Sequence, residues 1–198
     1  MSSRDELDLE IDLAPAQRAA ARVRDMLTGL RKCHDLARFE YTKRVRIAPT
    51  EIPHSHPVLT LNTFLRDDVA LLSAYLHEQM HWYVSWYSKS RPSDWDTLLA
   101  RLRARYPQVP AAGDGGAQDE FSTYLHLLVN WCEVDAASQF VSRETIVRHV
   151  GTLPFYRWIY RTVLDDWAEL AALYRATDAV PMRHATDMDS DDLAVSGE

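Results

Sequence analysis

The sequence predicts an α+β fold in which helices dominate. One observation is size and composition: the chain has 198 residues, 46% of them hydrophobic, which is enough for one globular domain with a substantial core. The other is the order of the patterns, with one helical stretch, two short stretches of strand-like alternation, and then several helical stretches. We therefore expect a small N-terminal β-sheet packed on a central helix, with several further helices following it.

The two ends of the chain differ in composition from the part between them. Residues 1–12 are polar and acidic, which predicts a disordered leader. Residues 181–198 are also acidic, and we expect them to form a disordered tail. The region between, residues 13–180, is expected to be a single domain.

The first predicted elements are a helix, two strands and a long central helix. Residues 14–33 have an apolar stripe at helical spacing and a proline in the first turn, which favours a helix start. Phe39–Ile47 and Val58–Phe64 alternate between apolar and polar side chains, as half-buried strands do. The central helix is expected to begin near Asp68, because acidic residues suit a helix N-terminus, and to end before Pro92.

The second half of the chain is predicted to be helical throughout. A Pro/Gly-rich loop at residues 107–120 interrupts it, and such a loop can border a cleft. The expected helices are Trp95–Tyr106, Phe121–Val141, Ser142–His149 and Pro154–Thr177.

Charge, cysteine content and hydropathy narrow the classes of protein. The formal net charge of −7 argues against a nucleic-acid-binding protein. The only cysteines, Cys33 and Cys132, form no CxxC motif, so neither a disulfide framework nor a thiolate zinc site is indicated. No apolar run approaches the roughly 20 residues that a membrane span needs, and no signal pattern opens the chain. We expect a cytoplasmic protein with no membrane partner; no oligomeric state follows from the sequence.

The central helix contains the pentapeptide His77-Glu78-Gln79-Met80-His81. At 3.6 residues per turn, His77 and His81 lie one turn apart on one face of a helix. Two imidazoles so placed can bind one Zn²⁺, with Glu78 beside them to act on a water molecule. A pair of core histidines with no metal is the simpler alternative, but a glutamate between them in a buried helix would then be costly. The sequence therefore predicts a metal site.

A catalytic zinc site needs a third protein ligand. The Phe121–Val141 helix offers His126 and Glu133 on one stripe, seven residues apart, which is about 10 Å along the helix axis. We therefore expect only one of the two residues to bind the ion. We prefer Glu133 as the ligand and expect His126 to donate a hydrogen bond to the substrate or to a developing oxyanion. His126 as the ligand is the alternative.

The HEQMH motif on a helix that follows a strand, with Glu133 on a later helix, resembles the zincin metallopeptidases. It is most similar to the gluzincin group, in a small, single-domain cytoplasmic form, over residues 58–141. The resemblance implies that His77, His81 and Glu133 hold Zn²⁺ and that Glu78 is the general base of peptide-bond hydrolysis. It also implies a peptide or protein substrate that pairs with an edge strand at Val58–Phe64.

Other interpretations of the sequence remain. Tyr156, Arg157 and Tyr160 sit at helical spacing in the last predicted helix. One of them, with Tyr160 preferred, is a candidate oxyanion donor, although an aromatic core with solvated arginines is the simpler interpretation. His54 and His56 have HxH spacing but lie in a proline-rich loop, where surface histidines are common. A non-catalytic zincin-like regulatory or binding module is an alternative function. A di-iron carboxylate protein is a further one, but Glu51 and His54 form the second ExxH in a loop rather than on a helix.

Overall fold

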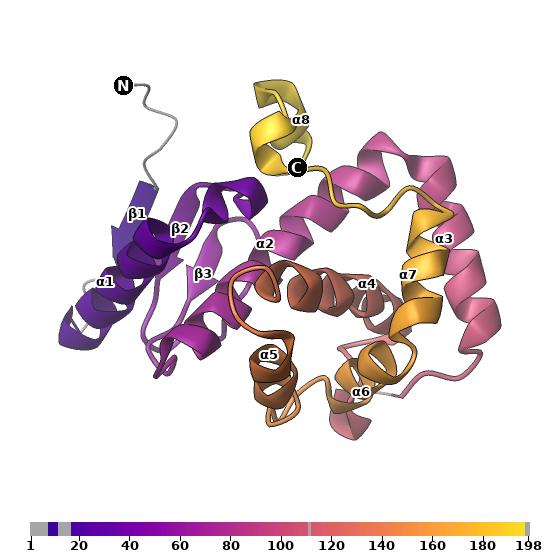
Figure 1. The fold of residues 1–198 in the computed structure, drawn as a ribbon, viewed down its shortest axis with the longest axis horizontal. Helices are drawn as coiled ribbons and strands as arrows, with labels where there is room; N and C mark the ends of the chain where they lie inside the picture. Colours follow the sequence, from indigo (N-terminus) through magenta and orange to yellow (C-terminus); the bar gives the residue numbers. More distant parts are fainter. Residues whose placement is uncertain (1–7, 12–16, 111, 197–198) are drawn as a thin grey trace. The chain divides into compact units, whose positions relative to one another are not determined.

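The computed structural model describes residues 8–11, 17–110 and 112–196 (Figure 1). The fold is α+β and mostly helical, as the sequence predicts. The chain divides into two compact units, residues 1–83 with 184–198 and residues 84–183. The single domain expected over residues 13–180 stays a prediction. Helix α2, Asp68–Ser90, begins in the first unit and ends in the second.

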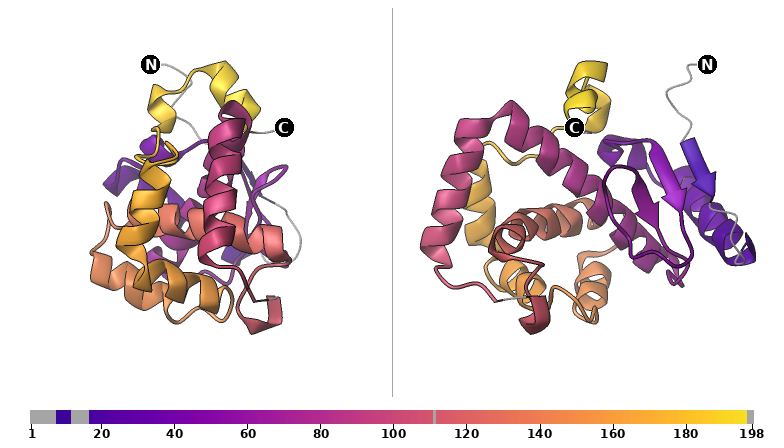
Figure 2. Two further views of the ribbon diagram at one scale, coloured as in Figure 1. Left: turned by 90° about the vertical axis from the view of Figure 1, so that its right-hand side faces the viewer. Right: turned by 180° about the vertical axis from the view of Figure 1, so that it is seen from behind.

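The first unit is built on a three-stranded sheet in which all described strands are parallel. The strand order is β1-β2-β3, with β1 at Asp8–Ile11, β2 at Arg44–Ile47 and β3 at Leu59–Leu61. Helix α1, Gln17–Cys33, connects β1 to β2 and packs against the sheet (Figures 1 and 2). Val45 and Ile47 of β2 are buried, as an apolar strand beneath a helix requires.

Strand β1 lies inside the stretch for which the acidic composition predicts a disordered leader. Its sequence, DLEI, alternates acidic with apolar residues, and that period of two is the strand signal that the composition obscures. In the register with β2, Asp8 is opposite Arg44 and Glu10 is opposite Arg46. The leader prediction is therefore corrected for residues 8–11; residues 1–7 and 12 lie outside the described part.

The strand expected at Phe39–Ile47 is shorter than the alternation predicts. Residues before Arg44 leave the sheet because Glu40, which is 2% exposed, is held elsewhere. The Glu40 carboxylate accepts two hydrogen bonds from Arg31, at 2.7 and 2.9 Å, and one from the Tyr75 hydroxyl at 3.1 Å. A buried carboxylate needs such partners, and they take precedence over local strand propensity.

Gln79, inside the HEQMH motif, joins α2 to the segment that precedes β2. Its side-chain oxygen accepts a hydrogen bond from the Thr42 backbone N–H at 3.0 Å, and its nitrogen donates one to the Thr42 carbonyl at 2.8 Å. The amide thereby satisfies both backbone groups of a buried residue, as a neighbouring strand would. Gln79 is 0% exposed, so this pair lies in the core of the first unit.

The second unit is helical, and α4 is its most buried helix. Most residues of α4 from Thr123 onward are buried, and α5 and α6 pack against it (Figure 2). The described helices of this unit are α3 Pro92–Arg105, η3 Ala112–Asp114, α4 Glu120–Ala137, α5 Arg143–Val150, α6 Arg157–Asp165 and α7 Trp167–Arg175. Asp119 caps α4 by accepting a hydrogen bond from the Ser122 N–H, and Ser142 caps α5 through the Thr145 N–H.

The single helix expected at Pro154–Thr177 is divided into α6 and α7. The break is at Asp166, whose backbone departs from helical geometry at φ −101° and ψ 28°. The Asp166 carboxylate accepts hydrogen bonds from the Tyr106 hydroxyl at 2.6 Å and from Arg105 at 3.1 Å, and the Tyr106 bond holds its pKa below the usual range. Helical periodicity runs through this position, so only the contact with the end of α3 marks the break.

The C-terminal stretch, for which composition predicts a disordered tail, contains two short helices in the first unit. These are η4, Ala185–Asp187, and α8, Ser190–Val195. Asp189 caps α8 by accepting from two backbone N–H groups, and the His56 ring donates a hydrogen bond to the Ser196 carbonyl at 2.9 Å. The tail prediction is therefore corrected for residues 181–196, because a cap and a distant histidine supply the order that a low apolar content does not. The remaining short helix of this unit is η2, Leu36–Phe39.

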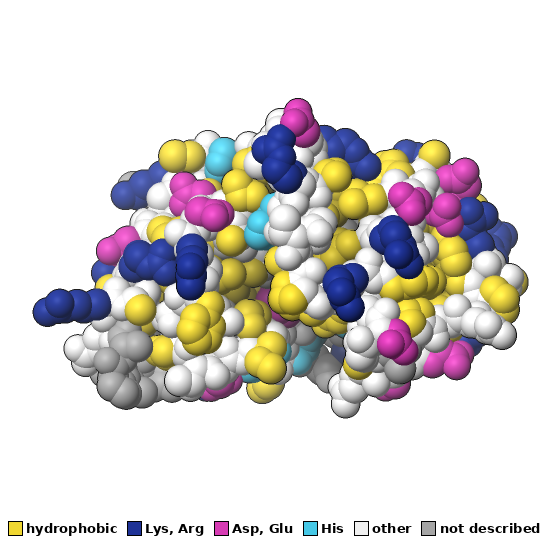
Figure 3. Space-filling model, turned by 90° about the horizontal axis from the view of Figure 1, so that it is seen from below, with side chains coloured by type: hydrophobic (Ala, Val, Ile, Leu, Met, Phe, Trp, Pro, Cys, Tyr) yellow, Lys and Arg dark blue, Asp and Glu magenta, His cyan; other side chains and the backbone are white. Residues whose placement is uncertain are grey.

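The surface carries charges of both signs. On the face shown in Figure 3, Lys and Arg side chains alternate with Asp and Glu side chains over a background that includes hydrophobic groups. Within the described residues, no helix combines the length and the apolar character that crossing a bilayer would require. The expectation that the chain does not bind nucleic acid rests on net charge alone and stays a prediction.

We predict that Gln79→Leu destabilises the protein by about 2–4 kcal/mol. The substitution removes two hydrogen bonds and leaves the buried N–H and C=O of Thr42 unsatisfied, each at a cost of roughly 1–3 kcal/mol. Urea denaturation followed by circular dichroism measures the change. Gln139→Leu is the matched control, because Gln139 lies after the end of α4 and is not buried. An equal loss in the two variants would contradict the role given to Gln79.

Candidate metal centre

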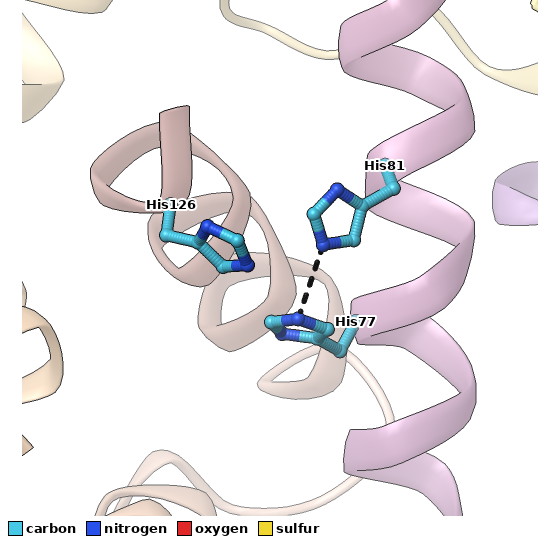
Figure 4. A group of neighbouring side chains, drawn as sticks. All are labelled: His77, His81 and His126. Carbon is cyan, nitrogen blue, oxygen red and sulfur yellow. Dashed lines mark hydrogen bonds between the residues drawn. The ribbon is translucent and has the colours of Figure 1, made fainter. Parts of the chain in front are cut away.

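Helix α2 presents His77 and His81 on one face, as the spacing predicts. Asp67 supports the start of the helix by accepting a hydrogen bond from the Ala70 N–H at 2.8 Å. The two rings lie with their centroids 5.0 Å apart, and their planes are inclined at 69°. Their Nε2 atoms are 3.3 Å apart (Figure 4), so both nitrogens converge on one region of space.

The separation of these two nitrogen atoms fits coordination of one ion. Two Zn–N bonds of about 2.0–2.1 Å at a tetrahedral angle put the nitrogens roughly 3.3–3.4 Å apart. The observed 3.3 Å between the Nε2 atoms of His77 and His81 agrees with that value. A hydrogen bond between two neutral imidazoles has a similar length, so this distance is compatible with an ion but is not specific to one.

His126 of α4 completes a group of three histidines. One ring nitrogen from each of His77, His81 and His126 lies within 4.8 Å of the other two, and Figure 4 shows the His126 ring directed toward the pair on α2. His77 and His126 are buried, and His81 is half-buried. Among the described residues, this is the group of histidine, cysteine and acidic side chains that has the spacing of a metal site.

The tautomer of His126 suits a metal ligand. Its Nδ1 lies 2.7 Å from the Ser122 carbonyl oxygen, which can only accept, so Nδ1 carries the proton. A neutral imidazole with its proton on Nδ1 has a lone pair on Nε2. Ligating histidines in proteins commonly donate their other N–H to a carbonyl group in this way. Ser122 was not singled out in the sequence, although its place four residues before His126 on a helix is the signal.

Glu133, the third ligand preferred from the sequence, lies in a different setting from His126. It is 0% exposed, and its carboxylate accepts a hydrogen bond from the Tyr160 hydroxyl at 2.7 Å. It does not belong to the group of residues with ligand spacing, whereas His126, the alternative, does. Tyr160, a candidate oxyanion donor, has its hydroxyl directed at Glu133. Both roles stay predictions, and the geometry favours His126 over Glu133 as the third ligand.

Two further polar residues accompany the histidines on these helices. Glu78 follows His77 on α2 and is 6% exposed, so its carboxylate is largely removed from solvent. Asn130 lies on α4 between His126 and Glu133 on the same stripe and is 0% exposed. Neither polar atom of the Asn130 side chain has a hydrogen-bond partner within the described part of the chain. A buried amide with no partner indicates that water or a ligand binds there.

Comparison of the chain with family models, with curated proteins and with solved structures finds no match. The resemblance to zincins therefore rests on the motif and stays a prediction.

The edge of the sheet differs from what the zincin resemblance implies. Strand β3 is last in the strand order, but its outer side is occupied at Thr60. The Thr60 N–H donates to the His54 carbonyl at 2.8 Å, and the Thr60 carbonyl accepts from the His54 N–H at 3.1 Å. A peptide could pair with Thr60 only by displacing His54. We therefore do not retain Thr60 as the position where a substrate backbone pairs.

We predict that Tyr160→Phe lowers the free energy of unfolding by about 1–3 kcal/mol, because the buried Glu133 carboxyl group loses a hydrogen bond. Tyr174→Phe is the matched control: Tyr174 is equally buried, and its hydroxyl has no hydrogen-bond partner among the described residues. Removal of that hydroxyl should leave stability unchanged or slightly increased. Thermal unfolding of both variants at one pH makes the comparison, and equal losses would contradict the importance of the Tyr160–Glu133 bond.

Proposed function

We propose that the protein is a zinc-dependent hydrolase that cleaves amide bonds, with His77, His81 and His126 as the zinc ligands and Glu78 as the general base. The observation that carries the proposal is the convergence of three imidazoles, one ligand atom from each lying within 4.8 Å of the others. The proposal includes zincin-like packing, since a strand, an HExxH helix and a later helix with a candidate ligand occur in that order.

The donor set fits zinc. Three neutral imidazoles with one further position for water or substrate form a ligand set that catalytic zinc sites use. Structural zinc sites, in contrast, are usually closed by four protein ligands. Imidazole also suits copper, nickel and iron, and of these zinc has no redox chemistry, which accords with a hydrolytic site. The three ligands include no carboxylate, so they do not form the carboxylate-rich site of a di-iron protein.

Bound zinc would act as a Lewis acid that polarises a carbonyl group and makes water more acidic. The role of Glu78 is to accept one proton from water as the water oxygen attacks the carbonyl carbon. It then returns that proton to the amide nitrogen as the C–N bond breaks, so that the products are a carboxylic acid and an amine, which then ionise in water. The burial of Glu78 supports this role, because proton transfer is more effective where bulk water is excluded.

The first prediction of this proposal concerns metal binding. The purified protein is expected to contain about one equivalent of zinc, and alanine at His77, His81 or His126 is expected to remove it. Elemental analysis after dialysis measures the content. His54→Ala is the matched control, since His54 belongs to the HxH loop and not to the group of three. Zinc retained in His126→Ala but lost in Glu133→Gln would restore Glu133 as the third ligand.

The second prediction concerns catalysis. Glu78→Gln is expected to keep its zinc but to lose about 10²–10⁴-fold in rate, which is the contribution that a general base makes. A mixture of peptides from the digestion of a denatured, unrelated protein is a suitable substrate, and mass spectrometry detects the new termini that cleavage produces. Wild-type protein that binds zinc but cleaves none of these peptides, or a Glu78→Gln variant as active as wild type, would contradict the hydrolase and favour a non-catalytic module.

A further inference from the structure

The residue that immediately precedes helix α6 has unusual backbone geometry. Tyr156, which precedes Arg157, has φ 53° and ψ 26°, in the left-handed region. Side chains with a Cβ atom rarely adopt this conformation, and a bulky aromatic residue there is an outlier. Within the described residues, Asp178, at φ 52°, is the other residue besides glycine with a positive φ. Such strain persists only where surrounding contacts hold it, and it concentrates at functional sites.

The contacts that hold Tyr156 in place are made by residues that follow it in the first turn of α6. Two residues later, the Trp158 N–H donates to the Gly115 carbonyl at 3.1 Å. Gly115 has φ 96°, and a Cβ atom there would lie 2.7 Å from the Trp158 nitrogen, so only glycine permits this approach. Four residues later, the Tyr160 hydroxyl reaches Glu133 of α4. The first turn of α6 is thus secured against both the loop before α4 and α4 itself.

The ring of Tyr156 lies against the imidazole of His126. The ring centroids are 4.4 Å apart, and the planes are inclined at 36°, which is a close but tilted ring contact. His126 is therefore restrained in two ways, by the hydrogen bond from Nδ1 to the Ser122 carbonyl and by an aromatic ring on its face. The hydrogen bond sets the tautomer, and the adjacent Tyr156 ring restricts rotation of the side chain. Both restraints come from residues of the second unit, as His126 does.

We propose that Tyr156 is a positioning residue that holds the imidazole of His126 in the orientation needed to bind zinc. This inference rests on the proposed function, since it gives the metal site a supporting residue. The strained backbone at Tyr156 is retained because it directs the ring onto His126, where a relaxed conformation would direct it elsewhere. Tyr156 acts on the metal only through His126 and is not itself a ligand.

The test compares Tyr156→Gly with Tyr156→Phe. Glycine relieves the backbone strain but removes the ring, whereas phenylalanine keeps the ring and removes only the hydroxyl. We expect Tyr156→Gly to weaken zinc binding 10–100-fold, the range typical of residues that orient metal ligands. Tyr156→Phe should bind zinc within about threefold of wild type, because the contact with the imidazole is made by the ring and not by the hydroxyl. Competition with a chromogenic chelator measures both affinities.

Asp178→Gly is the matched control for the backbone. It makes the same change at the other residue with a positive φ, and its ion pair with Arg91 is exposed and of little energetic weight. It should leave zinc affinity unchanged. Substitution of Co²⁺ for zinc adds a spectroscopic readout: the visible absorption bands of the ion should change in Tyr156→Gly and stay as in wild type in Tyr156→Phe and Asp178→Gly. A merely structural role of Tyr156 would not alter these bands.

The outcomes separate this inference from the proposed function. If wild-type protein binds zinc and Tyr156→Gly binds it equally well with the same cobalt spectrum, the positioning role is wrong and the metal site stands. If Tyr156→Phe loses as much affinity as Tyr156→Gly, the hydroxyl and not the contact of the ring with His126 is responsible, which also overturns the inference. If wild-type protein binds no zinc, the proposed function itself fails.

Discussion

The rotation of α2 about its own axis is set by the amide of Gln79. Both hydrogen bonds of this side chain go to the backbone of Thr42, and the pair is buried. On an ideal helix, Gln79 points about 180° away from the direction midway between His77 and His81. Once Gln79 is held, the two imidazoles must face the opposite way, and the position of the metal motif follows from a contact on the far side of the helix.

Helix α4 is held by comparable side-chain contacts, which it makes with Tyr156 and with α6. Tyr156 immediately precedes α6 and Tyr160 lies in its first turn, and each contacts one polar residue of α4. The ring of Tyr156 contacts the imidazole of His126, and the Tyr160 hydroxyl donates to Glu133. Each of the two candidate third ligands, His126 and Glu133, therefore contacts a tyrosine at the start of α6 or just before it. A rigid imidazole with a set tautomer is the kind of preorganised group that metal binding requires.

The buried polar residues fall into two groups with different consequences. Glu40 and Gln79 have all their partners within the first unit, and they stabilise the fold because each satisfies groups that would otherwise be costly to bury. Asn130 is as deeply buried, yet its amide has no partner within the described residues. Asn130 lies on the same stripe of α4 as His126, so the unsatisfied amide is one helical turn from a candidate metal ligand. An unsatisfied buried amide costs stability, so Asn130 contributes to the fold in a different way from Glu40 and Gln79.

By itself, the sequence determined the mostly helical α+β fold, the long α2 and the shared face of His77 and His81, because these follow from periodicities within a few residues. The tertiary structure decided what depends on distant partners. Glu40 left its strand because Arg31 and Tyr75 hold it, and Asp166 divided a helix because Tyr106 binds it. His126 and Glu133 share one stripe, so no local pattern could separate them. Their neighbours on other helices do so, because a side chain's role depends on what it packs against.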